Sequence, residues 1–313
     1  MNVLSLFDGI SCGQYSLKQS GIEVDTYYSS EIDKYAMQVT SKNFPNTIQL
    51  GDARDWKSWN IEKPDIIMAG FPCQSFSIAG NRLYFKDDRG KLFFTLIDIL
   101  RFYNPKYFII ENVKIIDSIV KLIDYEIGVE HMQINSSLVS AQNRVRYYWT
   151  NIPEVTQPED LDISFRSILD NSDAKDISTA EMLYMLRRTK DGRNHFEFNY
   201  LHHADNYKSN CVLANMCKGV PYNVCIERSS SMTCKRFKTY EVTNNQILVN
   251  NEYYRIKIPD GSYIFRKLTP KECERLQTLP DNYTAGISNT QRYKSIGNSW
   301  TSKVISHILG FIK

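Results

Sequence analysis

Segments typical of β-strands alternate with helical segments through the first 150 residues. Short apolar runs such as 2–6 and 65–70 are followed by longer stretches in which apolar residues recur at helical spacing. Strands separated by helices form βαβ units, which build a mainly parallel sheet with helices on both faces. The sequence therefore predicts an α/β fold. The expected strands are 2–6, 24–30, 65–70, 106–113 and 146–152. One expected helix ends near Gly21, and the other helices cover 31–44, 91–103 and 115–123.

The pattern changes after this region, which predicts a second, smaller domain. Residues 152–160 contain two prolines and several acids, as a linker does. Residues 165–260 are rich in Asn, Tyr, Ser and Lys without regular periodicity, so we expect an irregular fold there. A helix start follows, with Thr269 as N-cap, Pro270 at the first helical position and Glu272 three residues after the cap. The expected boundaries are 1–160 for the large domain, 165–284 for the small domain and 285–313 for a segment that packs back on the large domain.

The composition is that of a globular protein with a sizeable core. Of the 313 residues, 42% are hydrophobic and 23% are charged, and no apolar run approaches the ~18 residues of a membrane helix. The N-terminus has no basic stretch followed by an apolar run and a small-residue cleavage site, so we expect a cytoplasmic protein without a membrane partner. The seven cysteines are odd in number and irregularly spaced, which indicates reduced thiols.

Positive charge is concentrated in one segment. The net charge is +3, but residues 181–240 contain ten Lys or Arg against five Asp or Glu. A basic segment on a near-neutral body suits a polyanion such as nucleic acid, and a solvated surface with spare lysines explains the same excess. The charge alone leaves both explanations open.

Polar residues follow the first strands at the points where the strands are expected to end. The first strand leads into "FDGISCG", in which Gly9 and Gly13 mark a turn but do not complete a G-x-G-x-x-G fingerprint. Glu31 follows the second strand, and Asp52 lies in the next loop. Ligands bind at the carboxyl ends of the strands in such sheets, where an acid suits ribose hydroxyl groups. One acid per loop without a phosphate-binding fingerprint favours S-adenosylmethionine over NAD.

Cys73 lies directly after an apolar strand, in "GFPCQSFS". A free cysteine is most often a small buried hydrophobe, and that is the alternative to a reactive role. Here the cysteine comes after the strand end and is preceded by Pro72, and a long polar loop with Gly80 and Gly90 follows, as in a mobile lid. This context favours a nucleophile.

These segments together resemble the DNA cytosine-5 methyltransferase family, of prokaryotic or phage type. The resemblance covers the whole chain except roughly 165–260. It is carried, in order, by "LSLFDGISCG", "GFPCQSFSIAG", "ENV", "QNRVRYYW", "RKLTPKECERLQTLPDNY" and "SIGNSW". The chain departs from the family at Ser11 and Cys12, where relatives usually have a glycine pair, and at Ala79, where they often carry serine.

The resemblance implies a Rossmann-like domain that binds S-adenosylmethionine, a small target-recognition domain, and catalysis by four residues. Cys73 is implied as the nucleophile that adds to carbon 6 of cytosine, and Glu111 as the acid at ring nitrogen 3. To donate a proton, Glu111 needs an apolar site, so we expect the arginines to be kept apart from it. Arg144 and Arg146 alternate along a strand and point to one face; the resemblance places Arg144 near the cytosine carbonyl oxygen and gives Arg146 a structural or phosphate-binding role.

Two sets of binding residues are expected, the first implied by the resemblance and the second taken from the cysteine loop and from the basic segment 227–240. The set expected to hold S-adenosylmethionine is Phe7, Gly9, Glu31, Ile32, Asp52, Ala53, Leu92, Asn298 and Ser299. The set expected to contact double-stranded DNA is Gln74, Ser75, Ser77, Arg228, Lys235, Arg236 and Lys238. Cys211, Cys217, Cys225 and Cys234 lack a CxxC pair, so no metal site is expected.

Two other functions compete with a DNA methyltransferase. A tRNA cytosine-5 methyltransferase uses the same kind of cysteine loop, but the Cys-Phe-Thr motif associated with that branch is not found here. A catalytically silent DNA-binding relative would be expected to have lost at least one of Cys73, Glu111 and Arg144. The compact length favours a prokaryotic cell or a phage-infected host as the location. A monomer is expected, and a cognate restriction endonuclease is a candidate partner.

Overall fold

The computed structural model describes residues 1–72, 88–188, 192–197, 201–230 and 235–313, and its first lobe is built on a seven-stranded sheet. The strand order is β3-β2-β1-β4-β5-β7-β6, and all neighbours are parallel except those of β7, which runs antiparallel to both β5 and β6. This mainly parallel sheet confirms the predicted fold class. The strands are β1 (Asn2–Leu6), β2 (Thr26–Ser30), β3 (Ile48–Gln49), β4 (Ile66–Ala69), β5 (Tyr107–Val113), β6 (Met132–Asn135) and β7 (Val145–Thr150).

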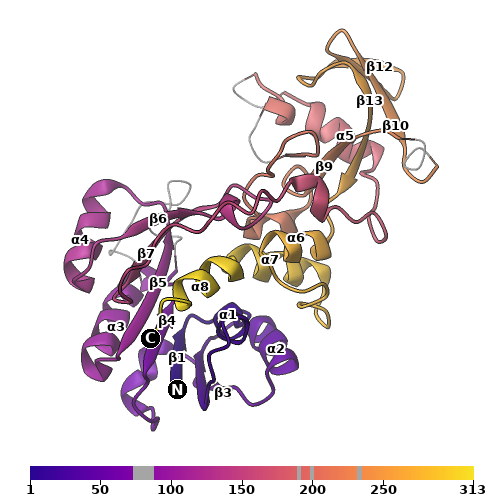
Figure 1. The fold of residues 1–313 in the computed structure, drawn as a ribbon. Helices are drawn as coiled ribbons and strands as arrows, with labels where there is room; N and C mark the ends of the chain where they lie inside the picture. The colour runs from indigo at the N-terminus through magenta and orange to yellow at the C-terminus, as the bar shows by residue number, and fades with distance from the viewer. Residues whose placement is uncertain (73–87, 189–191, 198–200, 231–234) are drawn as a thin grey trace.

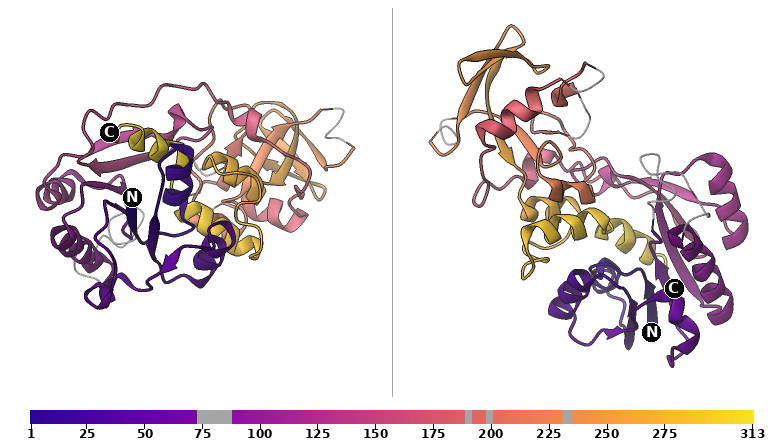
Figure 2. Two further views of the ribbon diagram at one scale, coloured as in Figure 1. Left: turned by 60° about the horizontal axis from the view of Figure 1, so that its bottom comes forward. Right: turned by 180° about the vertical axis from the view of Figure 1, so that it is seen from behind.

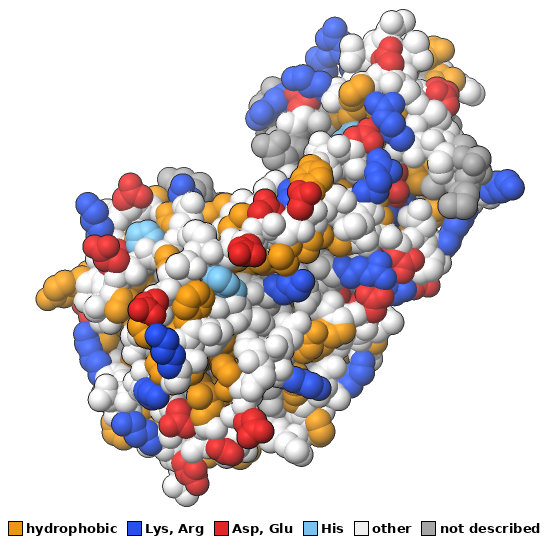
Figure 3. All heavy atoms as spheres, in the orientation of Figure 1, with side chains coloured by type: hydrophobic (Ala, Val, Ile, Leu, Met, Phe, Trp, Pro, Cys, Tyr) orange, Lys and Arg blue, Asp and Glu red, His pale blue; other side chains and the backbone are white. Residues whose placement is uncertain are grey.

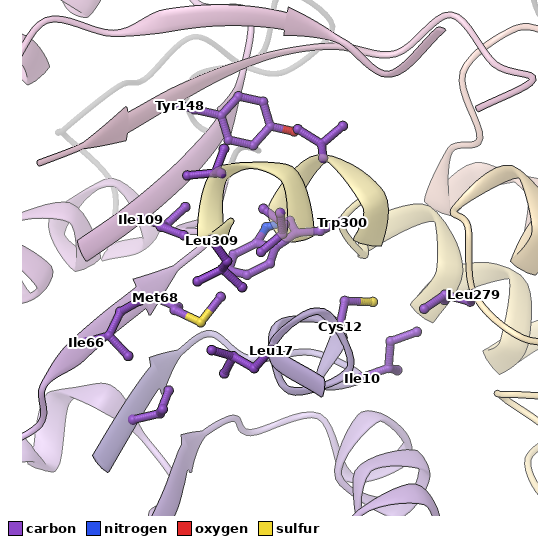
Figure 4. Packing of buried hydrophobic residues seen from close by; sticks show 14 of the residues in the cluster. Ile10, Cys12, Leu17, Ile66, Met68, Ile109, Tyr148, Leu279, Trp300 and Leu309 are labelled. Atoms are coloured by element: carbon purple, nitrogen blue, oxygen red, sulfur yellow. The ribbon is translucent and has the colours of Figure 1, made fainter. Parts of the chain in front are cut away.

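Helices cover both faces of this sheet, because successive residues of each strand point to opposite sides. In β4, Ile66 and Met68 belong to one apolar cluster, whereas Ile67 and Ala69 belong to another. The first cluster packs under α1, α2 and α8, with Trp300 over Met68 (Figure 4). The second packs under α3 and α4. The helices are α1 (Cys12–Gln19), α2 (Lys34–Asn43), α3 (Asp88–Tyr103), α4 (Asp117–Ile127) and α8 (Ser302–Leu309).

A second lobe contains a six-stranded sheet in the order β12-β11-β10-β13-β9-β8, in which only β8 and β9 pair in parallel. The sequence predicts an irregular region here, and the structure is more regular. Asparagine pairs make the hairpin turns: Asn244 and Asn245, then Asn250 and Asn251, all have positive φ, as two-residue hairpin turns require. The strands are β8 (His202–His203), β9 (Val224–Arg228), β10 (Thr239–Thr243), β11 (Gln246–Val249), β12 (Glu252–Arg255) and β13 (Gly261–Lys267).

Helices α6 and α7 lie between the two sheets (Figures 1 and 2). The predicted helix start is confirmed, since α6 begins at Pro270 after a capping box formed by Thr269 and Glu272. Gly297 in α7 is closely approached by the second lobe: a Cβ atom there would lie 2.2 Å from the backbone of Leu213. The remaining helices are α5 (Thr179–Leu186), α6 (Pro270–Leu276) and α7 (Asn289–Asn298), with short 3-10 helices at η1 (Ala53–Ser58), η4 (Ser136–Leu138), η5 (Phe165–Ile168), η6 (His195–Glu197) and η7 (Ala214–Lys218).

No helix among the described residues is both long enough and apolar enough to span a bilayer.

The burial of His202 in β8 predicts a loss of stability in acid. Burial lowers the pKa of His202 from its ordinary value of 6.5 to about 4. The unfolded chain therefore binds a proton near pH 6.5 that the folded chain does not bind until about pH 4. The free energy of unfolding should decrease as the pH falls through this window, by about 3 kcal/mol in full.

A His202→Gln variant isolates this contribution. Urea unfolding at several pH values between 7 and 4.5 should give a shallower dependence of stability on pH than in the wild type. His307→Gln, at the partly exposed His307, serves as the matched control for removing a histidine. Equal slopes for wild type and His202→Gln would show that His202 does not destabilise the protein in acid.

Candidate functional site

A cavity of about 390 Å³ lies beyond the carboxyl ends of β1, β2, β4 and β5. Its size is typical of small-molecule sites. All nine residues expected to hold a cofactor line it, and three of the four residues expected to be catalytic line the same cavity. The nine cofactor residues come from five separate parts of the chain: Phe7 and Gly9; Glu31 and Ile32; Asp52 and Ala53; Leu92; and Asn298 and Ser299. The three catalytic residues that line the cavity are Glu111, Arg144 and Arg146.

The loop after β1 is held open by left-handed backbone conformations. Phe7, Gly9 and Ser11 have φ values of 56°, 59° and 56°. Ser11 adopts this conformation, which favours glycine, at the position where the related family usually has a glycine pair. Its hydroxyl group contacts the carboxylate of Asp8 and lies 2.9 Å from Thr40 Oγ1. These contacts stabilise the turn with serine, not glycine, at position 11.

Glu31 supports the same loop from the end of β2. Its carboxylate accepts hydrogen bonds from the backbone N–H groups of Gly9 (2.8 Å), Ile32 (2.7 Å) and Asp33 (2.8 Å). Burial raises the pKa of Glu31, and these three N–H groups oppose that rise. Glu31 therefore fixes the backbone on two sides of the cavity while its carboxylate lines the cavity wall.

Asp52 and Ile32 line the outer part of the cavity. The Asp52 carboxylate accepts from the backbone N–H of Arg54 at 2.9 Å and pairs with its guanidinium. The Arg54 side chain holds the pKa of Asp52 below its ordinary value, so the group is a carboxylate that can accept further hydrogen bonds. Ile32 is 71% exposed although it is apolar. An exposed isoleucine and a hydrogen-bond acceptor that line the same cavity suit a flat heterocycle with an amino group.

Glu111 in β5 forms an ion pair with Arg146 in β7, with 3.0 Å between Oε1 and Nε. Both side chains are nearly buried. The expectation that the arginines are kept apart from Glu111 is therefore wrong for Arg146. The antiparallel pairing of β5 with β7 explains this, because it brings Val113 opposite Arg146 and places both charged groups at the end of β5.

Arg144 is used for another purpose. Its guanidinium donates to the carbonyl oxygens of Val212 (2.9 Å) and Ser299 (2.8 Å), and only 3% of the residue is exposed. A guanidinium with these partners is a structural link between the second lobe and the 297–299 turn. Arg146 therefore faces Glu111, whereas Arg144 binds backbone carbonyl oxygens. Both guanidiniums reach Cys211, so the prediction that they share one face is confirmed.

The strand end that precedes Cys73 is fixed beside Glu111. Asn112, the next residue in β5, donates from Nδ2 to the carbonyl oxygen of Phe71 at 3.1 Å. Phe71 is buried, and Pro72 lines the cavity. The chain therefore reaches the cavity one residue before the predicted nucleophile. Cys73 itself lies outside the described residues, as do Gln74, Ser75 and Ser77.

The turn after α7 closes the remaining side. Asn298 is exposed, whereas Ser299 is buried and its hydroxyl donates to the carbonyl oxygen of Ile296 at 2.7 Å. Lys294 on α7 reaches Asp33, the N-cap of α2, at 2.8 Å. This ion pair joins α7 to the start of α2, and both residues line the cavity.

Sequence reasoning missed several residues that line the cavity: Asp8, Asp33, Arg54, Asn112, Lys294 and Trp300. Asp8 is the most informative, because its buried carboxylate accepts from Tyr27 (2.8 Å) and Ser29 (2.9 Å) and organises the loop. Burial raises the pKa of Asp8. The sequence signal for Asp8 is its position directly after a strand, between Phe7 and Gly9. Trp300 is recognised only in three dimensions, where its ring fits against Gly70.

The expected DNA-contacting residues that the structure describes lie in the second lobe. Arg228 pairs with Asp205 at 2.8 Å, and Arg236 donates to the carbonyl oxygen of Ser172 at 2.5 Å. Lys238 lies over the ring of Tyr240 at 4.8 Å, and Lys235 is exposed. Figure 3 shows further Lys and Arg side chains on the visible face of both lobes.

No group of three or more metal-ligating side chains is found in the part of the chain that the structure describes. Cys225 is buried in β9, Cys211 and Cys217 are partly exposed, and Cys234 falls outside the described residues.

Comparisons with known proteins agree on one family. The family profile of the C-5 cytosine-specific DNA methylases matches residues 1–313. The type II methyltransferase M.HpaII of Haemophilus parainfluenzae is 30% identical over 95% of this chain and 84% of its own length. M.HhaI of Haemophilus parahaemolyticus is 28% identical over 98% and 93%. Among solved structures, Spodoptera frugiperda DNMT2 shares the fold, with a TM-score of 0.64 and 22% identity over 99% of this chain and 98% of its own.

Proposed function

Because this chain belongs to the C-5 cytosine-specific DNA methylase family, we propose that it methylates carbon 5 of cytosine within a specific short sequence of duplex DNA. The observation that carries the proposal is one cavity that holds two sets of groups. Carboxylates suited to a nucleoside and the Glu111–Arg146 pair line the same cavity, which Pro72, the residue before Cys73, also lines. The cavity can thus hold a methyl donor and a base together.

The cavity residues fit S-adenosylmethionine. Glu31 would accept hydrogen bonds from the ribose hydroxyls, Asp52 would accept from the adenine amino group, and Ile32 would cover the face of the adenine. Phe7, Gly9, Ala53 and Leu92 would surround the nucleoside, and Asn298 and Ser299 would lie near the methionine end. When bound, this group supplies an electrophilic methyl group.

Cytosine requires activation, because carbon 5 is a poor nucleophile. In the proposed reaction the thiolate of Cys73 forms a bond to carbon 6, and the electrons of the 5,6 double bond make carbon 5 nucleophilic. Carbon 5 would then bond to the donor's methyl group while the methyl–sulfur bond breaks and leaves a neutral thioether, and the proton on carbon 5 would leave to a base or to water. The electron pair of the broken C–H bond re-forms the double bond and expels the Cys73 thiolate.

Glu111 and Arg146 would act on the ring during thiolate addition. Negative charge then develops toward ring nitrogen 3 and the carbonyl oxygen. We assign Glu111 to nitrogen 3, as a hydrogen-bond partner or proton donor, and Arg146 to the carbonyl oxygen. This assignment replaces the role expected for Arg144, whose guanidinium is bound to backbone carbonyls.

Cys73 cannot reach a cytosine inside a duplex, so the base has to be flipped out of the helix at a cost of a few kcal/mol. We assign Gln74, Ser75 and Ser77 to contacts with the flipped nucleotide or its phosphates. The second lobe, with Arg228, Lys235, Arg236 and Lys238, would contact the duplex through phosphates and base edges.

A Glu111→Gln variant should transfer methyl groups at least about 10²-fold more slowly in single-turnover assays. The amide keeps the shape of the side chain, but it cannot act as a proton donor and it breaks the ion pair with Arg146. The rate of methyl transfer to a duplex that carries the target site measures the effect.

Glu126→Gln provides the matched control, because Glu126 is a carboxylate of α4 that pairs only with the surface residue Arg101 among the described residues. Its rate should equal that of the wild type. A Glu111→Gln rate within threefold of wild type would remove Glu111 from the proposed mechanism.

The proposed function is tested by transfer of labelled methyl from S-adenosylmethionine to duplex DNA and to tRNA in parallel, with mapping of the modified base. Label at carbon 5 of cytosine in DNA is the expected result, and mapping would also identify the target sequence. Label only in tRNA would replace the proposal with the tRNA enzyme. DNA binding without label on any of a set of random-sequence duplexes would favour the silent DNA-binding protein.

A further inference from the structure

Trp300 has an indole N–H group without a partner at the wall of the cavity. The residue follows Ser299 in the turn after α7, lines the cavity and is 9% exposed. No hydrogen-bond acceptor for its Nε1 atom is found among the residues that the structure describes, and Nε1 is not sealed from solvent. Because a polar group in a nearly buried site is costly without a partner, this N–H group favours a ligand atom that accepts a hydrogen bond.

Two glycines leave the space that the ring of Trp300 occupies. A Cβ atom at Gly70, directly after β4, would lie 2.7 Å from Nε1, and one at Gly13 in α1 would lie 3.3 Å from Cζ3 of the ring. The ring also packs over Met68 (Figure 4). The indole is therefore held on several sides, and its N–H group is fixed beside the end of β4.

The start of α1 adds positive potential next to Trp300. Cys12, the first residue of α1, also lines the cavity, and its thiol interacts with the side chain of Ser299 and the backbone of Trp300. The N-cap residue Ser11 makes no side-chain cap, since its hydroxyl group contacts the carboxylate of Asp8. The first N–H groups of a helix without a side-chain cap carry partial positive charge and favour an anion.

Asp8 is the carboxylate of this loop, and it is turned toward β2. Its Oδ1 atom accepts a hydrogen bond from Tyr27 at 2.8 Å, and its Oδ2 atom accepts one from Ser29 at 2.9 Å. Burial raises the pKa of Asp8. The carboxylate is thus satisfied by hydroxyl groups of β2, which leaves the N–H groups of Trp300 and of the start of α1 for a ligand.

The acceptors and donors of the cavity match the two ends of S-adenosylmethionine. Glu31 and Asp52 are acceptors that suit the hydroxyl and amino groups of the nucleoside. Trp300 and the start of α1 are donors, and the carboxylate of the methionine part is the only anionic group of the molecule. We propose that Trp300 donates a hydrogen bond from Nε1 to this carboxylate, beside the start of α1. The inference rests on the proposed function and deepens it.

The first test compares S-adenosylmethionine with its decarboxylated analogue, which keeps the sulfonium and ammonium groups. Trp300→Phe removes the N–H group and keeps an aromatic ring. In titration calorimetry, Kd for S-adenosylmethionine should rise about tenfold in Trp300→Phe, as for loss of a hydrogen bond to a charged group, and Kd for the analogue should change less than about twofold. Equal losses for both ligands would assign Trp300 to packing alone and overturn the proposal, as would no loss for either.

Trp59→Phe is the matched control. The indole N–H group of Trp59 also has no partner in the described part of the chain, but Trp59 does not line the cavity. The Kd values of both ligands should stay at those of the wild type. A loss for S-adenosylmethionine in Trp59→Phe equal to that in Trp300→Phe would show that the effect does not come from the cavity, and would overturn the proposal.

NMR of the indole N–H groups tests the hydrogen bond in the wild-type protein. The chain has four tryptophans, so isotopic labelling of tryptophan gives four indole signals. The signal of Trp300 is the one that is missing from Trp300→Phe. S-adenosylmethionine should move this proton signal downfield, and the decarboxylated analogue should move it much less. Equal shifts with the two ligands, or no shift, would overturn the proposal.

Failure of the proposed function gives a different pattern. Wild-type protein would then bind S-adenosylmethionine more tightly than Trp300→Phe does, with no such difference for the analogue, but would transfer no methyl group to DNA. That result would leave the role of Trp300 standing. Wild-type protein that does not bind S-adenosylmethionine would overturn this inference together with the proposed cofactor.

Discussion

Replacing Cys73 with alanine is expected to lower methyl transfer to cytosine by about 10⁴-fold or more. Without a thiolate at carbon 6, carbon 5 keeps the low nucleophilicity of the aromatic ring, and no other step of the mechanism compensates for this. Loss of an attacking group removes the whole covalent route, so this change should exceed the effect of any single hydrogen-bond donor in the cavity.

The structure supports this expectation through the residues that precede Cys73. Phe71 is buried, its carbonyl oxygen is held by Asn112, and Pro72 lines the same cavity as Glu111 and Arg146. Because the strand end is fixed by a neighbouring strand, replacing the next residue in the chain should leave the cavity intact. Binding of S-adenosylmethionine to Cys73→Ala should therefore resemble that of the wild type.

Two measurements check the prediction. Labelled methyl transfer to target duplex gives the rate, and a duplex with 5-fluorocytosine at the target position gives a trapped covalent complex, because fluorine replaces the proton that has to leave. Wild type should form a denaturant-stable complex and Cys73→Ala should form none. Cys217→Ser is the matched control and should form the complex. Residual transfer above about 1% of wild type in Cys73→Ala would rule out Cys73 as the essential nucleophile.

The sequence grouped three residues that line the cavity because the position of each is a local feature. Gly9, Glu31 and Asp52 each follow a strand, and parallel strands bring their carboxyl ends to one edge of the sheet. The order of the strands did not have to be known for these residues to be grouped. Glu111, in β5, was added to this group by the family resemblance.

The different uses of Arg144 and Arg146 could not be predicted in this way. Arg146 lies in β7 and Arg144 directly precedes that strand, so a separation of two positions gives them the same face. What separates them is the identity of partners that are distant in sequence: Val212 and Ser299 for Arg144, and Glu111 for Arg146. The second sheet was missed for a different reason. Its strands are short, and its two asparagine pairs add to the polar composition of the segment, which hides the hairpin turns that they form.

Arg266 is expected to contribute more to stability than any other charged residue in the described part of the second lobe. It is fully buried in β13, pairs with Glu227 in β9 and binds Glu272 in α6 at 2.7 Å and 3.0 Å. The guanidinium thus joins the second sheet to the helix at the junction of the lobes. Arg266→Met would leave two nearly buried carboxylates without a cation. We expect the free energy of unfolding to fall by about 3–5 kcal/mol.

Urea unfolding followed by circular dichroism measures this change, and two further variants show its origin. Arg255→Met removes an exposed arginine from β12 of the same sheet and should change stability by less than about 0.5 kcal/mol. Adding Glu227→Gln to Arg266→Met should recover part of the loss, because one of the uncompensated charges is removed. Glu272 is the less suitable partner to replace, since its carboxylate also accepts from the backbone N–H of Thr269 at 2.7 Å and caps α6. If Arg266→Met lowers the free energy of unfolding by less than about 1 kcal/mol, water or neighbouring groups compensate the two carboxylates. Apolar packing, and not this ion pair, would then hold the second sheet to α6.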